Sequence, residues 1–138
     1  MEIWEGVLMG LFDGYKKKSL IKKATKLIDK HQSEEDFKKG LKLVNKALEL
    51  DSGYALAWNL KGAALIGLAE PDIGVKCLDK AIELDPELAA PWYGKGLVSQ
   101  KLGKYEEAIG YYNKALEIDS SFEPALKAKE EVLKLMKN

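Results

Sequence analysis

The stretch Lys80-Ala81-Ile82-Glu83-Leu84-Asp85 decides the fold, because the chain repeats it at a fixed spacing. Lys-Ala-Leu-Glu-Leu-Asp stands at 46–51 and Lys-Ala-Leu-Glu-Ile-Asp at 114–119, so each copy begins 34 residues after the one before it. Aligning residues 55–88 with 89–122 gives nine identities in 34 positions, Trp58 with Trp92 among them. An internal period of this length is the signature of a repeat array.

Each unit is predicted to hold two helices. In residues 89–122, apolar and small side chains recur at helical spacing, first at Trp92, Gly96 and Ser99 and then at Ala108, Ile109, Tyr112, Ala115 and Leu116. Gly103-Lys104 between the two stripes predicts a turn. Asp85-Pro86-Glu87 predicts the start of the next helix, with Asp85 as the N-cap and Pro86 in the first turn. Ala, Leu, Lys and Glu dominate the units, which disfavours strands.

These units resemble the tetratricopeptide repeat family, whose pattern has an aromatic residue at position 4, small residues at 8 and 20, a large residue at 24, Ala at 27 and Pro near 32. Residues 89–122 carry Trp92, Gly96, Ala108, Tyr112 and Ala115 at the first five of these positions, and residues 55–88 carry Trp58, Gly62, Gly74, Leu78, Ala81 and Pro86. Residues 21–54 are a degenerate unit, with Ala24 for the aromatic residue and Ile28 for the small one.

We therefore predict an all-α fold, a right-handed superhelical solenoid of three helix pairs at 21–54, 55–88 and 89–122. A single helix pair cannot bury its apolar face alone, so neighbouring pairs must stack. Residues 123–138 have one apolar and one lysine-rich face, which predicts a capping helix. Residues 1–20 are predicted to be an N-terminal amphipathic segment that precedes the repeat domain at 21–138.

The resemblance implies a binding groove, because in this family the first helices of the pairs line a concave face where ligands lie. The family's lining positions predict eight partner-binding residues here: Leu56, Asn59, Ala63, Tyr93, Leu97, Gln100, Lys101 and Lys127. This surface is mostly apolar, with lysines toward its C-terminal end. The expected partner is therefore a protein or peptide segment that is partly apolar. For Leu56, Tyr93 and Leu97, ordinary packing at the edge of the core is the competing interpretation.

One subclass of the family binds acidic chaperone tails through a clamp of Lys, Asn and Arg side chains. The clamp positions hold Thr25, Asp29, Leu60, Ala90 and Gly94 in one frame, and Asn59, Ala63, Gly94, Pro124 and Ala128 in the next. Neither frame fits. The chain also contains no Arg, which removes the bidentate anchor that carboxylate recognition favours. We expect no carboxylate clamp.

Composition excludes several other classes of function. The 138 residues contain 22 Lys against 22 acidic residues, and without Arg the neutral chain is poorly equipped for nucleic acid. Its single cysteine, Cys77, and single histidine, His31, are interpreted as a packing residue and a helix-end residue, which leaves no disulfide, metal site, catalytic centre or cofactor to expect. No apolar run could span a bilayer and no secretory signal is recognised, so we expect a cytoplasmic protein that is not an enzyme.

Residues 1–14 form an apolar helical stripe made of Ile3, Trp4, Val7, Leu8, Leu11 and Phe12. Three interpretations compete: a helix that packs on the degenerate first repeat, a helix that inserts into a groove of its own or a neighbouring chain, and an interfacial membrane anchor with Lys16, Lys17 and Lys18 on anionic lipid.

The function we expect is a non-catalytic adaptor that binds a partner peptide or helix in its concave groove. The alternative is a self-associating scaffold, in which the N-terminal helix of one chain occupies the groove of another. A third possibility is an enzyme accessory that touches the membrane.

Overall fold

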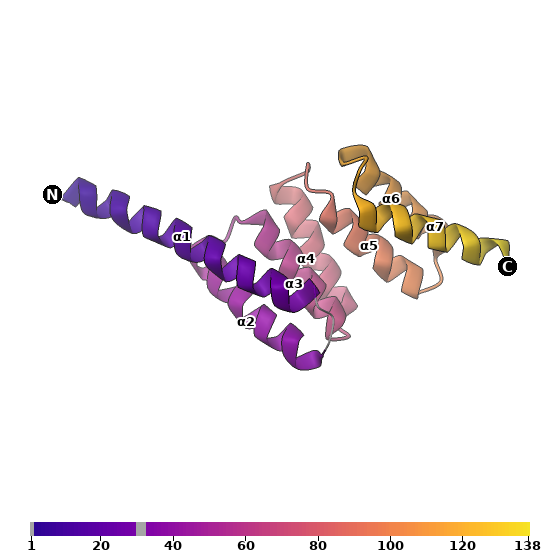
Figure 1. The fold of residues 1–138 in the computed structure, drawn as a ribbon, viewed down its shortest axis with the longest axis horizontal. Helices are drawn as coiled ribbons and strands as arrows, with labels where there is room; N and C mark the ends of the chain where they lie inside the picture. The colour runs from indigo at the N-terminus through magenta and orange to yellow at the C-terminus, as the bar shows by residue number, and fades with distance from the viewer. Residues whose placement is uncertain (1, 30–32) are drawn as a thin grey trace.

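The computed structural model describes residues 2–29 and 33–138, and these residues form helices and short connections without strands (Figure 1). The prediction of an all-α fold is confirmed. The helices are α1 (Glu2–Asp29), α2 (Glu34–Leu50), α3 (Ala55–Gly67), α4 (Pro71–Leu84), α5 (Ala90–Lys101), α6 (Tyr105–Ile118) and α7 (Glu123–Lys137). His31 lies outside the described residues, so its interpretation stays a prediction.

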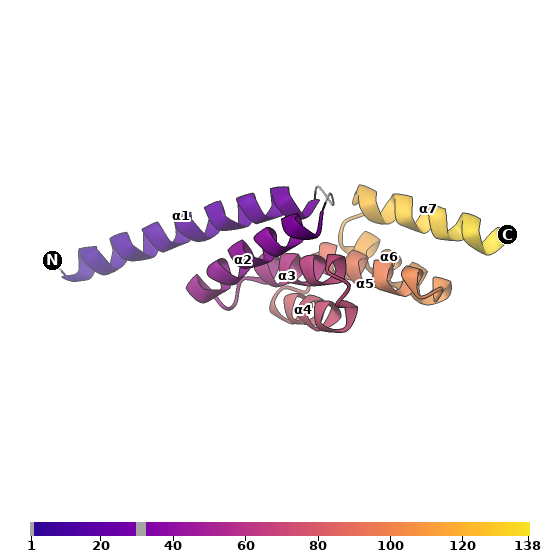
Figure 2. The same cartoon turned by 90° about the horizontal axis from the view of Figure 1, so that it is seen from below.

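The helices stack as pairs in two layers. Each pair contacts the next, and contacts of α1 with α3, of α3 with α5 and of α5 with α7 join the first helices of the pairs into an inner layer. Helices α2, α4 and α6 form the outer layer. Figure 2 shows α1 and α7 on the same side of α3, with α4 on the opposite side. Helices α1 and α7 thus stand at the two ends of the inner layer, and both are longer than α3 and α5.

Small residues allow the two helices of each pair to touch. A Cβ atom at Gly62 would lie 2.6 Å from Leu78 Cδ2 and 2.8 Å from the carbonyl oxygen of Gly74, distances that a real Cβ cannot occupy. The degenerate unit reverses this arrangement. Its large residue is Ile28 on the first helix, and Gly40 on the second helix makes room for it, since a Cβ there would lie 2.7 Å from Ile28 Cγ1. Both arrangements preserve close packing.

The recurring aspartate ends the second helix of each pair. Asp51, Asp85 and Asp119 are the C-caps of α2, α4 and α6. Each accepts a hydrogen bond from the backbone N–H two residues later, at 3.0, 3.0 and 3.1 Å, which is an Asx turn. The prediction that Asp85 caps the following helix is therefore wrong. Its carboxylate is used by the turn, and α5 begins five residues later at Ala90.

The predicted turn at Gly103-Lys104 is confirmed. Gly103 has a φ of 74°, and the following N–H of Lys104 donates to the Ser99 carbonyl at 2.9 Å. The equivalent position in the preceding unit is Ala69, with a φ of 62°. An alanine there adopts a left-handed conformation that is strained for any residue with a Cβ.

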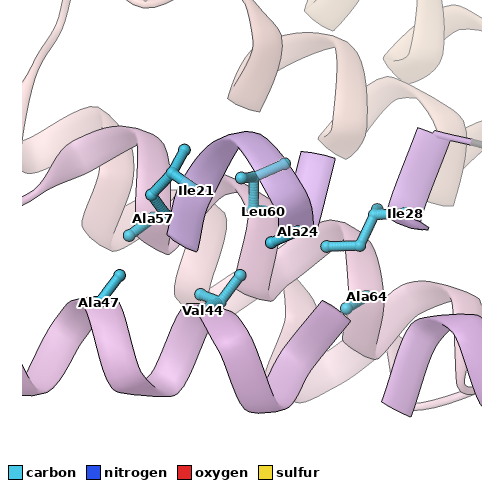
Figure 3. Packing of buried hydrophobic residues seen from close by; sticks show 8 residues of the cluster. All are labelled: Ile21, Ala24, Ile28, Val44, Ala47, Ala57, Leu60 and Ala64. Atoms are coloured by element: carbon cyan, nitrogen blue, oxygen red, sulfur yellow. The ribbon is translucent and has the colours of Figure 1, made fainter. Parts of the chain in front are cut away.

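Two apolar clusters form the core at either end of the stack. The first contains Ile21, Ala24, Ile28, Val44, Ala47, Ala57, Leu60 and Ala64, which come from α1, α2 and α3 and point toward one another in Figure 3. The second is built by Ala89, Tyr112 and neighbouring side chains of α6 and α7. Each cluster joins a helix pair to the helix that follows it, as in a repeat array whose pairs stack.

Helix α1 runs without a break through the expected boundary at residues 20 and 21. Its C-terminal half enters the core, whereas residues 3–13 are all exposed and extend away from the other helices (Figures 1 and 2). Ile3 is 81% exposed and Trp4 71%. The interpretation of this stripe as a helix packed on the first repeat is therefore wrong. Within residues 2–29 and 33–138, no helix has the length and apolar character needed to cross a membrane.

Candidate functional site

A cavity of about 650 Å³ opens on the inner layer between α1 and α7. Its walls come from both ends and the middle of the stack. The lining residues are Ile28, Asp29, Phe37, Asn59, Leu60, Ala63, Ile66, Gly67, Leu78, Ala90, Tyr93, Gly94, Leu97, Lys101, Phe122 and Pro124. We call this cavity the groove. Its volume is within the range of pockets that hold a ligand or several side chains of a partner.

Five of the eight residues predicted to bind a partner line the groove. Asn59 and Ala63 lie on α3, and Tyr93, Leu97 and Lys101 lie on α5. Asn59, Ala63, Tyr93 and Leu97 are half-buried, while Lys101 is exposed. They come together because α3 and α5 are adjacent inner helices, and the same positions of successive units then face the same space.

The other three predicted residues lie outside the groove lining. Leu56 packs at the edge of the first core cluster, as the competing interpretation held for it. Tyr93 and Leu97 likewise pack against the second cluster, in addition to lining the groove. Gln100 accepts a 2.6 Å hydrogen bond from the hydroxyl of Tyr112, so its amide oxygen has a partner within the chain. Lys127 lies exposed on α7 and is within 3.7 Å of Glu123.

An aromatic cluster forms the C-terminal end of the groove. The ring of Tyr93 lies 5.9 Å from that of Tyr112 and 5.8 Å, edge to face, from that of Phe122. Burial and the nearby Glu131 carboxylate raise the pKa of Tyr93. Burial raises the pKa of Tyr112 further, with smaller contributions from Tyr93 and Glu131. Both hydroxyls therefore stay protonated at neutral pH and can donate hydrogen bonds.

Sequence reasoning missed Phe37 and Phe122, the two aromatic residues that extend the groove beyond the inner helices. Phe37 belongs to α2, and it reaches the inner face because Gly67 has no side chain: a Cβ at Gly67 would lie 2.6 Å from Phe37 Cε1. Phe122 precedes α7 and is the last residue of its unit. A search limited to the first helices could find neither residue. Gly67 is the sequence feature that points to Phe37, because a glycine on an inner helix leaves room for a ring from a neighbouring helix.

Charge is sparse in the groove. Asp29 and Lys101 are the two charged side chains among its lining residues. At positions where a carboxylate clamp has Lys, Asn or Arg, the lining of this groove has Asp29, Leu60, Ala90 and Gly94. The acidic side chain at one of them would repel a carboxylate.

A second cavity of about 380 Å³ adjoins the groove at the end of α3 and α5. It shares Ile66, Gly67 and Lys101 with the groove and is otherwise lined by Ala69, Pro71, Val98 and Leu102. The shared residues make the two cavities one continuous, mainly apolar surface along the inner layer.

Candidate metal ligands do not gather in the part of the chain that the structure describes. Among residues 2–29 and 33–138, no three His, Cys, Asp or Glu side chains are placed to hold a metal ion. Cys77 is a buried free cysteine, and burial raises the pKa of its thiol. A protonated, buried thiol is a packing group and a poor nucleophile.

Helix pairs stacked in register, with a groove along their first helices, define the class of helical-repeat solenoid proteins. The chain belongs to the tetratricopeptide repeat family, whose repeat matches residues 55–88 and again residues 89–122. Residues 21–54 carry the same helix pair in degenerate form. A comparison with curated proteins gave no match.

Solved structures share the fold. The OM64 TPR domain of Arabidopsis is 17% identical, with a TM-score of 0.73 over 88% of this chain and 98% of that one. The first TPR of Spaghetti (RPAP3), bound to the HSP90 peptide SRMEEVD, is 16% identical, with a TM-score of 0.71 over 90% and 95% of the two chains. An O-GlcNAc transferase mutant of Thermobaculum terrenum is 22% identical with a TM-score of 0.74, over 88% of this chain but 22% of that one.

Proposed function

We propose that this protein is a non-catalytic adaptor that holds a partly apolar segment of a partner protein in its groove. The proposal rests on the groove, a cavity of about 650 Å³ on the inner layer with a mainly apolar lining. Apolar concave surfaces with a few polar groups are the usual form of a binding site. Tyr93 and Leu97 supply apolar contact, and Asn59 and Lys101 supply polar groups at the groove wall.

The solved relatives support peptide binding as the general activity. The TPR domain of Spaghetti was solved with an HSP90 peptide, and the second TPR domain of human RPAP3 with the HSP70 peptide SGPTIEEVD. Both peptides end in acidic residues. The groove of this chain has a carboxylate, Asp29, among its few charged residues, and the chain has no Arg. We therefore propose the same mode of binding with a different, less acidic partner.

Selection of peptides on the purified protein tests this proposal. Peptides from a random-sequence display library should be enriched in apolar and aromatic residues. The double variant Tyr93→Ala, Leu97→Ala should bind the selected peptide at least about tenfold more weakly, because truncating a central contact residue costs 1 kcal/mol or more. Isothermal titration calorimetry measures the affinities, and circular dichroism checks that the variant is folded.

Ile73→Ala is the matched control, since Ile73 is 52% exposed on outer helix α4 and away from the groove. It should leave the affinity unchanged. Asn59→Ala gives a second groove variant that removes no aromatic packing. Equal affinity of the wild type and both groove variants would contradict the proposal, and so would micromolar binding of a peptide ending in EEVD.

A further inference from the structure

The N-terminal half of α1 presents a large apolar face that no part of the described chain covers. Eight large side chains are between 49% and 81% exposed: Ile3, Trp4, Val7, Leu8, Met9, Leu11, Phe12 and Tyr15. The three aromatic side chains alone, Trp4, Phe12 and Tyr15, expose on the order of 400 Å², since a whole aromatic side chain has roughly 150–250 Å². Monomeric proteins rarely expose contiguous apolar patches larger than a few hundred Å². A face of this size therefore points to a partner.

The face cannot fold back into the groove of its own chain. Ile21 and Ile28 are buried in the first core cluster, and they hold the C-terminal half of the same continuous helix in place. Ile28 lies at the groove, and at a rise of 1.5 Å per residue Leu8 is about 30 Å away along the axis. Occupation of the groove by this helix would have to come from another molecule.

Four of the exposed side chains form a seam with coiled-coil spacing. Trp4, Leu8, Leu11 and Tyr15 are separated by four, three and four residues, which is the alternation of heptad core positions. The seam is self-complementary when reversed. In an antiparallel pair with Leu8 of one helix facing Leu11 of the other, Trp4 faces Tyr15 at each end. A two-fold symmetric interface requires this kind of self-complementarity.

The charges around the seam favour the same arrangement. From Ile3 to Tyr15 the charged side chains are the acidic Glu5 and Asp13, whereas Lys16, Lys17 and Lys18 follow directly. A basic polar face would suit anionic lipid, but the polar face here is acidic. An antiparallel partner places Glu5 of one copy toward Lys16 of the other. A parallel partner would set acid against acid and lysine against lysine.

We propose that a second copy of this chain covers the face, and that the two α1 helices pair antiparallel along Trp4, Leu8, Leu11 and Tyr15. A standard interface buries about 800 Å² on each partner, so the pairing has to draw on Val7 and Phe12 beside the seam as well as on the four seam residues. The pairing uses the part of α1 that projects beyond the repeats (Figure 2), and none of its residues lines the groove, so each groove stays open. In the dimer, the two repeat domains, each with its own groove, would lie at opposite ends of the paired helices. This inference is independent of the proposed adaptor function.

Analytical ultracentrifugation of the full chain tests the pairing. The wild type should pass from monomer to dimer as concentration rises, and Leu8→Glu, Leu11→Glu should stay monomeric at concentrations where the wild type is dimeric. Both side chains are over 60% exposed, so the substitutions leave the core intact. Ile73→Glu, on an exposed apolar residue of α4, is the matched control and should dimerise like the wild type.

Cysteine cross-linking tests the orientation. A mixture of the Trp4→Cys and Tyr15→Cys variants should form an interchain disulfide on mild oxidation, whereas neither variant alone should do so. The native Cys77 is buried and gives a low background. Cross-linking within the Trp4→Cys sample alone would indicate a parallel pair and overturn the proposal.

The wild type and its variants also distinguish the other ways in which the apolar face of α1 could be covered. A wild type that stays monomeric at every concentration overturns the pairing. Loss of the dimer in Leu97→Glu, a groove variant, would instead indicate insertion of α1 into a neighbour's groove. A monomer that binds vesicles of phosphatidylserine and phosphatidylcholine, and loses this binding in Leu8→Glu, Leu11→Glu, would indicate an interfacial membrane helix. Either result rejects the antiparallel pair.

Discussion

At the scale of single residues, the presence or absence of a Cβ decides how closely the helices of a pair approach. The ring of Tyr112 is fully buried and lies against Gly96, where a Cβ would come within 2.6 Å of Tyr112 Cδ1. The Tyr112 hydroxyl donates a 2.6 Å hydrogen bond to Gln100, which fixes the outer end of the ring. A Cβ at Gly110, on the same pair, would meet no atom within 4 Å apart from the adjacent residues and the nearby backbone of its own helix.

Gly96→Ala and Gly110→Ala should therefore shift stability in opposite directions. Gly96→Ala should lower the free energy of unfolding by about 1–3 kcal/mol, the usual cost of overpacking a filled core. Gly110→Ala should raise it by up to about 1 kcal/mol, because alanine favours a helix interior over glycine. Urea denaturation followed by circular dichroism measures both. Equal effects of the two substitutions would show that the Gly96 contact carries no packing constraint.

At the scale of the helix pair, the turn between its two helices sets the angle at which the second helix returns. Gly103 occupies the left-handed position of this turn in one unit, and Ala69 occupies it in the unit before. The side-chain hydrogen bonds of the Asx turns recur between units in the same way. The backbone geometry of the repeat is thus kept even where the residue best suited to it is replaced.

Ala69→Gly should stabilise the protein, because glycine adopts a positive φ without the steric cost that alanine bears. The gain should be up to about 1 kcal/mol, partly offset by the greater freedom of glycine in the unfolded chain. The reciprocal variant Gly103→Ala should lose about 1–2 kcal/mol. Thermal unfolding checks the pair. A lower melting temperature for Ala69→Gly would contradict this account of the turn.

At the scale of the whole molecule, the two halves of α1 have different roles. Its C-terminal half contributes Ile21, Ala24 and Ile28 to the first core cluster. The half also carries Lys17, which forms a 2.7 Å ion pair with Asp51 and lowers the pKa of that carboxyl group. The N-terminal half, with residues 3–13 exposed, adds nothing to the core of its own chain.

Deletion of residues 1–14 should leave the monomer as stable as before. At concentrations where the full chain is monomeric, the free energy of unfolding should change by less than about 0.5 kcal/mol, as for surface changes in general. Self-association should be lost completely. Differential scanning calorimetry at low concentration, with sedimentation at high concentration, makes the comparison. A large fall in stability at low concentration would mean that this segment packs on its own repeats.

Sequence alone determined the helix pairs, their 34-residue period and the residues that are small because two helices touch. These features depend on local periodicity and on identical contacts in each unit, so a single sequence is enough to predict them. The degenerate first unit was visible as well, through Ala24 and Ile28. The sequence did not show that Gly40 makes room for Ile28, because this is a contact between two helices.

Only the tertiary structure decided which residues share the groove. Five of the eight predicted residues line it because stacked first helices repeat the same face. Gln100 is engaged by Tyr112, and Phe37 and Phe122 enter the lining from elements outside the inner layer. The sequence likewise could not determine whether the apolar stripe on α1 is exposed. A helical periodicity states which side chains share a face, but only the packing of the other helices decides whether that face is covered.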